Sequence, residues 1–125
     1  MGCGSCGMGK SAFRWQIEHR VLPAVRAFKP DLILLSAGFD AGNHDVGNDR
    51  LDTEDTRSGI DLDADDFQWV TQKVMDVATL TCDGKLVSVL EGGYGRWKKV
   101  QKGYTIDRTL LAENCTAHVK ALAGL

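Results

Sequence analysis

The segments LILLSAGFDA (residues 32–41) and VSVLEGGY (residues 87–94) decide the fold of this chain. The first opens with an apolar run, residues 32–35, that shows no polar alternation and is bounded by a proline and a glycine. Such a run is typical of a strand covered on both faces, as in a parallel sheet. In the second segment, β-branched valines predict another strand over residues 85–90, which runs into two glycines and a tyrosine.

Helical patterns lie before, between and after the two predicted strands. Apolar residues recur at steps of three and four and predict helices over residues 13–28, 63–80 and 111–122. Asp63, with Asp66 three positions later, predicts a capping box at the start of the second helix. The order helix, strand, helix, strand, helix predicts an α/β fold with parallel strands and helices packed on the sheet.

Three segments have no hydrophobic period. Residues 1–10 are rich in glycine and predict a disordered or loop N-terminus, so the domain proper runs over residues 11–125. Residues 42–61 are polar and acidic and predict a long loop, and residues 95–107 predict an irregular insert. Two strands alone make a poor sheet, because each is an unprotected edge with an apolar face. We therefore expect the chain to supply only part of a larger sheet.

The composition excludes several classes of protein. Hydrophobic residues make up 43% and charged residues 26% of the 125 residues, which is typical of one globular domain and not of a disordered segment. The net charge of −2 predicts no direct contact with nucleic acid. No apolar run is long enough for a bilayer, so we expect no membrane partner. Four cysteines without a secretory signal indicate free thiols in a reducing compartment.

One chemically useful side chain follows each predicted strand. Asp40 comes directly after the first strand and Tyr94 after the second, with glycines beside both. Ligands of open α/β sheets bind just beyond the carboxyl ends of the strands, and glycines there allow backbone or ligand to approach closely. The sequence therefore predicts a site at this edge. The plainer alternatives are an aspartate that caps a turn and a tyrosine that packs on its ring.

The two segments, in this order and separated by a helix of the kind DDFQWVTQKVM, resemble the histone deacetylase and acetylpolyamine amidohydrolase family. Class II-like members are most similar, because Glu91 precedes the two glycines. The resemblance extends to GMGKSAFRWQIEHRVLPAVRAFKPD and LAENCTAHVKALAGL, and is interrupted near residues 47–59 and 95–108. It implies the C-terminal part of a three-layer α/β/α domain with a parallel sheet, of the arginase–deacetylase type.

The resemblance also implies roles for particular residues. Asp40 matches the family's aspartate ligand to Zn²⁺, and Tyr94 matches the tyrosine whose hydroxyl donates to the scissile carbonyl oxygen. Phe39, Gly92 and Gly93 match the wall of the acyl-lysine channel. The implied reaction is zinc-dependent hydrolysis of an N-acetyl amide, with an acetylated protein such as a histone, or an acetylated polyamine, as substrate. The implied location is the nucleus or the cytoplasm.

The chain departs from the family pattern at the metal and at the acid–base residues. It has no Asp-x-His pair and no two adjacent histidines, and its three histidines are His19, His44 and His118. A catalytic zinc takes about three protein ligands, and the resemblance implies one, Asp40. We therefore expect the isolated chain to be inactive and to lack the N-terminal part of the same domain. Asp45 matches an acidic loop position, for which we expect a structural role.

Two short motifs suggest other functions that their context does not support. GSCGMGKS, residues 4–11, fits the P-loop pattern, but only three residues precede it where a strand is required, so we expect no nucleotide binding. Cys3 and Cys6 form half of a zinc motif without a second pair at the right spacing.

The remaining candidates have structural interpretations. The acidic loop lacks the spacing of an EF-hand, and His44 is expected to be an exposed loop residue. Packing is the expected role of Cys82, Cys115 and His118. A second hypothesis for the whole chain is a non-catalytic binding module, or a remnant with an exposed sheet edge.

Overall fold

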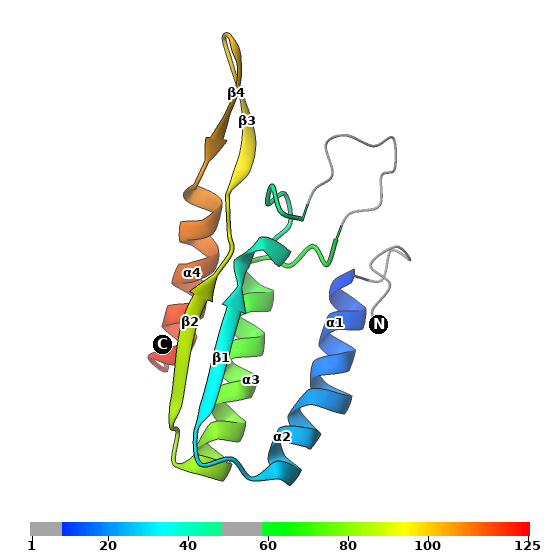
Figure 1. The fold of residues 1–125 in the computed structure, drawn as a ribbon, viewed down its shortest axis with the longest axis vertical. Helices are drawn as coiled ribbons and strands as arrows, with labels where there is room; N and C mark the ends of the chain where they lie inside the picture. The colour runs from blue at the N-terminus through cyan, green and yellow to red at the C-terminus, as the bar shows by residue number, and fades with distance from the viewer. Residues whose placement is uncertain (1–8, 49–58) are drawn as a thin grey trace.

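A computed structural model describes residues 9–48 and 59–125 (Figure 1). The elements are α1 (Gly9–Gln16), a π-turn segment η2 (Ile17–Val21), α2 (Leu22–Phe28), β1 (Ile33–Gly38), a 3-10 turn η3 (Phe39–Ala41), α3 (Ala64–Cys82), β2 (Leu86–Glu91), β3 (Arg96–Val100), β4 (Gly103–Asp107) and α4 (Thr109–Leu122). The predicted order of helices and strands is therefore confirmed, with one hairpin added. In the described residues no helix is both long and apolar enough to cross a membrane.

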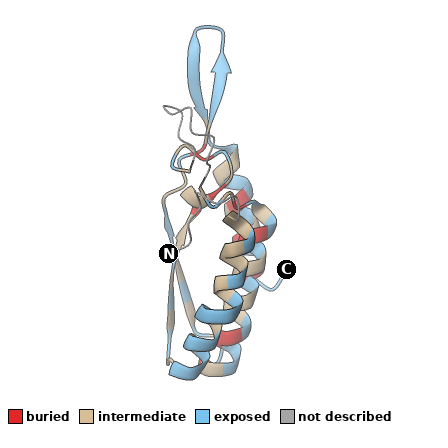
Figure 2. Ribbon diagram, turned by 90° about the vertical axis from the view of Figure 1, so that its right-hand side faces the viewer, coloured by how far each residue is buried: buried red, intermediate tan, exposed pale blue. Residues whose placement is uncertain are grey.

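Strands β1 and β2 form a two-stranded parallel sheet, as the sequence predicts. Helices α3 and α4 pack against one face of this sheet, and the other face carries no helix among the described residues (Figures 1 and 2). Apolar side chains point from that bare face into solvent, and Leu34 is 74% exposed and Val89 56%. The described chain therefore provides a sheet and one helical layer of the predicted three-layer α/β/α fold.

The first predicted helix is continuous but widened in its middle. The N–H of Leu22 donates to the carbonyl of Ile17, five residues earlier, so η2 is a π-turn placed immediately before Pro23. A proline in a regular helix lacks a donor, and its ring clashes with the carbonyl four residues back. The wider turn accommodates this ring, and the helix continues to Phe28. Lys29, at φ 54°, then ends it before Pro30.

Helix α3 begins with the predicted capping box. The side chain of Asp63 accepts from the N–H of Asp66, and the side chain of Asp66 accepts from the N–H of Asp63. Lys10 and Arg14 of α1 both form ion pairs with the buried Asp66. The start of α3 and the first helix are thereby tied together. Helix α1 begins at Gly9, four residues before the predicted helix and two before the predicted start of the domain at residue 11. The prediction for residues 1–8 lies outside the described residues.

The predicted irregular insert at 95–107 is wrong. Strands β3 and β4 pair antiparallel, with Trp97 opposite Ile106 and Val100 opposite Gly103, and form a hairpin that projects beyond the sheet (Figure 1). The turn residues Gln101 and Lys102 are not the Asn-Gly or Asp-Gly pair that signals a short hairpin. Residues 42–48 and 59–63 contain no helix or strand, apart from one bridge between Gly42 and Leu62, so the loop prediction is confirmed there.

The buried core lies between the sheet and the helices, and it contains a fully satisfied histidine. His118 of α4 contacts the Thr71 hydroxyl through Nδ1 at 2.7 Å and the Ser88 hydroxyl through Nε2 at 2.8 Å. The Thr71 hydroxyl donates to the carbonyl of Phe67, so it accepts from Nδ1. Burial favours the neutral ring and lowers the pKa of His118, and in that neutral ring the Ser88 hydroxyl donates to Nε2. The predicted packing role of His118 is confirmed.

We expect the stability of the chain to fall as the pH drops through about 6.5, the usual pKa of an unfolded histidine. Below this pH the unfolded chain binds a proton at His118, whereas the folded chain, in which the pKa of His118 is lower, does not. The contribution of the neutral His118 to the free energy of unfolding is therefore complete above this pH and is lost as the pH falls below it. Urea unfolding between pH 7.5 and pH 5.5 measures the effect. His118→Gln should flatten this dependence.

Candidate active site

The parallel register of the sheet brings the two predicted site segments together. Gly38 at the end of β1 lies opposite Glu91 at the end of β2, so Asp40 and Gly92 follow at the same edge. Asp40 is in the short 3-10 turn η3, where the first strand leaves the sheet. This is the carboxyl edge, at which α/β sheets bind their ligands.

The side chains of Asp40 and Tyr94 flank a third glycine, Gly47. A Cβ atom added to Gly47 would lie 2.9 Å from Cβ of Asp40 and 3.2 Å from Cδ2 of Tyr94. Both side chains therefore border the same small space, although 54 residues of sequence separate them. Tyr94 is 56% exposed, and Asp40 is half-buried. The structure thus brings together the predicted metal ligand and the predicted oxyanion donor.

The predicted channel residues Phe39, Gly92 and Gly93 adjoin this pair. Gly92 and Gly93 have φ of 65° and 82°, a region that favours glycine. A Cβ on Gly92 would lie 2.5 Å from Oδ1 of Asp40, and one on Gly93 would lie 2.8 Å from Cβ of Phe39. Phe39 itself is 2% exposed and packs on Phe67, so it belongs to the core beneath the site and its ring is not on the surface. The two glycines are needed because the first strand's turn lies against them.

Asp45 holds the tyrosine segment against the acidic loop. Its buried carboxylate accepts from the N–H groups of Tyr94 and Gly95, both at 2.9 Å, and from that of Gly47 at 2.8 Å. The N–H of Val46 donates in turn to the carbonyl of Gly95 at 2.7 Å. Charge-assisted bonds from three backbone donors fix both segments in one geometry. These contacts agree with the structural role that the sequence predicts for Asp45.

The described residues do not form a complete metal centre. Within the ranges 9–48 and 59–125, no three His, Cys, Asp or Glu side chains are grouped so that they could share a metal ion. A catalytic zinc takes about three protein ligands, so Asp40 fits as one ligand and the described donor set does not fit the whole ion. His44 is exposed, and His118 is occupied in the core. Cys82 and Cys115 are free thiols, and burial raises the pKa of Cys115.

The P-loop pattern has no support in the described part of the motif. Lys10 lies in helix α1, and its ammonium group pairs with Asp63 and Asp66. Residues 4–8 of the pattern, together with Cys3 and Cys6, lie outside the described residues.

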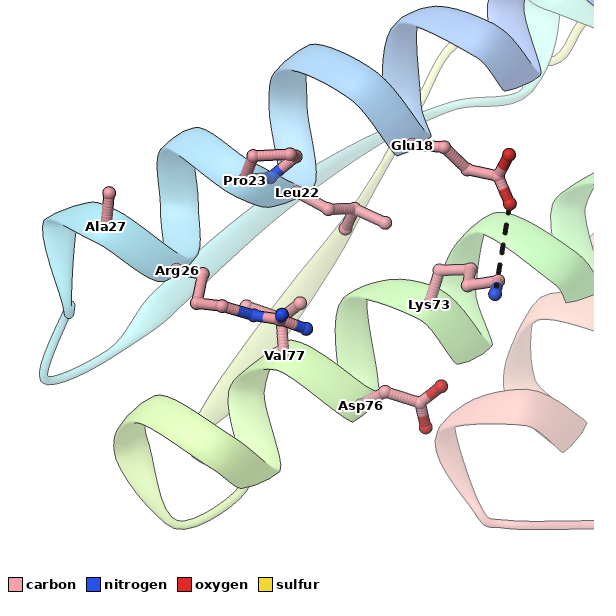
Figure 3. Close-up of a pocket in the computed structure, with 8 residues that line it drawn as sticks. All are labelled: Glu18, Leu22, Pro23, Arg26, Ala27, Lys73, Asp76 and Val77. Carbon is pink, nitrogen blue, oxygen red and sulfur yellow. Dashed lines mark ion pairs between the residues drawn. The ribbon is translucent and has the colours of Figure 1, made fainter.

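A groove of about 520 Å³ lies between α2 and α3, far from the carboxyl edge of the sheet (Figure 3). Charged side chains of both signs line it, and Glu18 and Lys73 pair across it at 3.9 Å. Arg26 extends from α2 toward Val77 of α3 (Figure 3), and Asp76 also lines the groove. Helix α2 lies near the start of β1 (Figure 1), and neither Asp40 nor Tyr94 lines the groove, so it is separate from the candidate site.

A model of the histone deacetylase domain matches residues 4–107, which is most of the chain. The chain therefore belongs to the histone deacetylase domain family. Its fold is a small part of the α/β deacetylase fold, as the crystal structure of the HDA15 HD domain shows. That structure has a TM-score of 0.58 and 27% sequence identity to this chain, and the match covers 90% of this chain and 24% of that one.

Curated relatives support the same assignment. The chain is 36% identical over 115 residues to type-2 histone deacetylase 2 of Dictyostelium discoideum, a match that covers 91% of this chain and 6% of that protein. It is 35% identical over 88 residues to the histone deacetylase-like amidohydrolase of Pseudomonas aeruginosa, covering 70% of this chain and 20% of that protein. The chain thus spans a fifth or less of the length of these relatives.

We expect Gly92→Ala to destabilise the chain more than Gly103→Ala. Both residues have positive φ, where a side chain costs about 1–2 kcal/mol, but only the Gly92 position lies against Asp40. No atom lies within 4 Å of a Cβ on Gly103, so this variant carries the backbone cost alone. The free energy of unfolding in urea measures the difference. Equal losses would contradict the close packing of Gly92 on Asp40.

Proposed function

We propose that this chain is the portion of a zinc-dependent deacetylase that supplies one metal ligand, Asp40, and the oxyanion donor, Tyr94. The observation that carries the proposal is the convergence of these two side chains on Gly47, at the carboxyl edge of a parallel sheet. Membership of the histone deacetylase family supports hydrolysis of N-acetyl amides as the reaction. The proposed substrate is an acetyl-lysine of a histone or another protein, or an acetylated polyamine.

The proposed role of Tyr94 follows from its hydroxyl group and from the way its backbone is held. As the acetyl carbon becomes tetrahedral, its oxygen gains negative charge, and a phenolic O–H can donate to that oxygen. Such a donor is effective only if it is already in position, and the bonds from Tyr94 and Gly95 to Asp45 fix the backbone that carries it. Tyr94 is half-exposed, which leaves its ring accessible to a substrate.

Zinc, when bound, would polarise the acetyl carbonyl and supply the attacking water. Asp40 would hold it through one carboxylate oxygen, and Gly92 leaves room for that carboxylate. The described residues supply no second and third ligand grouped with Asp40. We therefore propose that the isolated 125-residue chain is inactive, and that activity requires further ligands together with a general base. The proposed location is the nucleus or the cytoplasm.

The purified chain is expected to release no acetate from acetyl-lysine peptides or from acetylated spermidine at saturating Zn²⁺. The physical reason is that one carboxylate cannot hold a catalytic zinc. A coupled acetate assay measures the turnover. Zinc-dependent release that disappears in Asp40→Asn would contradict the proposed inactivity.

A graft tests the two proposed residues directly. Residues 9–125 replace the matching segment of the HDA15 HD domain, and deacetylation and bound zinc are measured on the folded graft. Tyr94→Phe is expected to lower kcat by about 10²- to 10³-fold, as for loss of one oxyanion donor, with zinc content unchanged. Asp40→Asn is expected to lose zinc as well as activity. Glu113→Gln, at an exposed position of α4 outside the site, is the control and should leave both unchanged.

The bare face of the sheet favours a second role, in which the chain is a non-catalytic binding module. Leu34, Val87 and Val89 are at least half exposed on adjacent strands, which is a large apolar surface for a soluble domain. The graft separates the two roles. A folded, active graft in which Tyr94→Phe has no effect would favour the binding module.

A further inference from the structure

The β3–β4 hairpin begins two residues after Tyr94 and projects away from the body of the molecule (Figure 1). Its base is fixed by the ion pair of Arg96 with Asp107 at 3.2 Å and by the bond from Val46 to Gly95. The carboxylate of Asp107 also accepts from Thr109 at the start of α4, which lowers the pKa of Asp107 to about 2. The hairpin is therefore a positioned arm beside the proposed active site.

The two sides of the hairpin differ in chemistry. In the antiparallel register, Trp97 lies opposite Ile106 and Lys99 opposite Tyr104, so these four residues share one face. Trp97 is 40% exposed, Ile106 39% and Tyr104 67%. Lys98 is on the opposite face. One face thus combines aromatic and aliphatic surface with an ammonium group.

The hairpin is basic on an otherwise acidic molecule. Residues 96–108 contain five basic side chains and one acidic one, whereas the whole chain has a net charge of −2, so the remaining residues carry −6. Arg96 is paired with Asp107. Within the part of the chain that the structure describes, Lys98, Lys99 and Lys102 have no ion pair with a carboxylate, and all three are exposed. Three ammonium groups therefore remain available to an anionic partner.

A two-stranded hairpin with both faces in solvent is only marginally stable by itself. Cross-strand pairs such as Trp97 with Ile106 add about 0.2–1 kcal/mol each. Exposed tryptophan and tyrosine side chains are also those that protein interfaces favour, because they bury a large area and lose little conformational entropy. The composition of this arm is therefore that of an interface.

We propose that the β3–β4 hairpin is a docking surface for an acidic stretch of the polypeptide that carries the acylated lysine. The position next to Tyr94 rests on the proposed function, but the docking itself does not require catalysis. Lys99, on the face of Trp97 and Tyr104, and Lys102 in the turn would pair with carboxylates that flank the acylated lysine, and the two aromatic rings would pack on the chain between those carboxylates. Lys98, on the opposite face, would add to the electrostatic attraction. The site would then prefer acidic substrate sequences over the basic sequences typical of histone tails.

Charge distribution favours a short acidic peptide over nucleic acid. A duplex extends beyond a hairpin of this length and would approach the body of the molecule, which carries −6 outside residues 96–108. Asp65 is exposed at the start of α3, on the side from which the hairpin projects, and would repel phosphates. A peptide of a few residues can pair with the hairpin alone.

Fluorescence anisotropy with two labelled peptides tests the proposal on the whole chain. One peptide is rich in Asp and Glu, the other is neutral and of equal length, and neither contains an acylated lysine. We expect the chain to bind the acidic peptide, with an affinity that falls as salt rises, because exposed charge pairs are screened. The triple variant Lys98→Glu, Lys99→Glu and Lys102→Glu should bind about tenfold more weakly or not at all.

The matched control reverses the charge of three lysines outside the hairpin, through the substitutions Lys29→Glu, Lys85→Glu and Lys120→Glu. These residues are exposed and lie outside the hairpin, so the net charge changes equally while binding should stay within about twofold. A milder triple change of the hairpin lysines to glutamine should weaken binding in the same direction. Circular dichroism checks the fold of each variant.

Three outcomes would overturn the proposal: no binding of the acidic peptide, equal loss in both triple variants, or tighter binding of duplex DNA through the same lysines at the same salt. An acetyl-lysine added to the acidic peptide separates this proposal from the proposed function. If the acidic peptide binds through the hairpin, but the grafted enzyme ignores Tyr94→Phe, the docking surface stands and the catalytic role fails.

Discussion

The parallel pairing of β1 with β2 is the constraint on which the site depends. Because the strands run in the same direction, Gly38 lies opposite Glu91, and the two chain segments leave the sheet at the same edge. A shift of two residues in register would carry Asp40 past Gly92, and the side chain would lose its place against the glycine backbone. Helices α3 and α4 hold this register by packing on the face that carries Ile33, Leu35 and Leu86. The position of the site therefore follows from the backbone hydrogen bonds between β1 and β2.

Two local features, the glycines after β2 and the carboxylate of Asp45, complete the positioning of the site that the pairing of β1 with β2 begins. At Gly92 and Gly93, positive φ and the lack of a Cβ let the second segment turn directly beside Asp40 and Phe39. At Asp45, one buried carboxylate accepts from three backbone N–H groups in two segments of the chain. The glycines permit the close approach, and the carboxylate fixes it. Both features determine where Asp40 and Tyr94 lie with respect to one another.

The two faces of the β1–β2 sheet differ, because helices cover one face and not the other in the described chain. One face packs against helices α3 and α4. There the ring of His118, a residue of α4, forms hydrogen bonds with Thr71 of α3 and with Ser88 of β2. The other face exposes Leu34 and Val89, which an independent domain would bury. This asymmetry fits a match that covers 24% of the HDA15 HD domain. The three-layer architecture belongs to the family, while the described residues make up two layers of it.

The sequence by itself determined the elements that depend on local pattern. The apolar run 32–35, the capping box of Asp63 and Asp66, and the glycines after β2 each have a short-range physical cause, and the structure has all three. The family could likewise be identified, because its motifs around Asp40 and Tyr94 are contiguous, whereas the roles of these two residues stay predictions.

Tertiary structure alone decided the contacts between distant segments. The hairpin escaped prediction because its turn, Gln101-Lys102, lacks a strong local signal, and its stability comes from cross-strand pairs. The bonds from Tyr94 and Gly95 to Asp45 join residues that are 49 and 50 positions apart, so no local sequence pattern predicts them. The convergence of Asp40 and Tyr94 on Gly47 depends likewise on the register of two strands and on a loop folded back over them. Such contacts are set by packing in three dimensions, whereas capping and periodicity are set within a few residues.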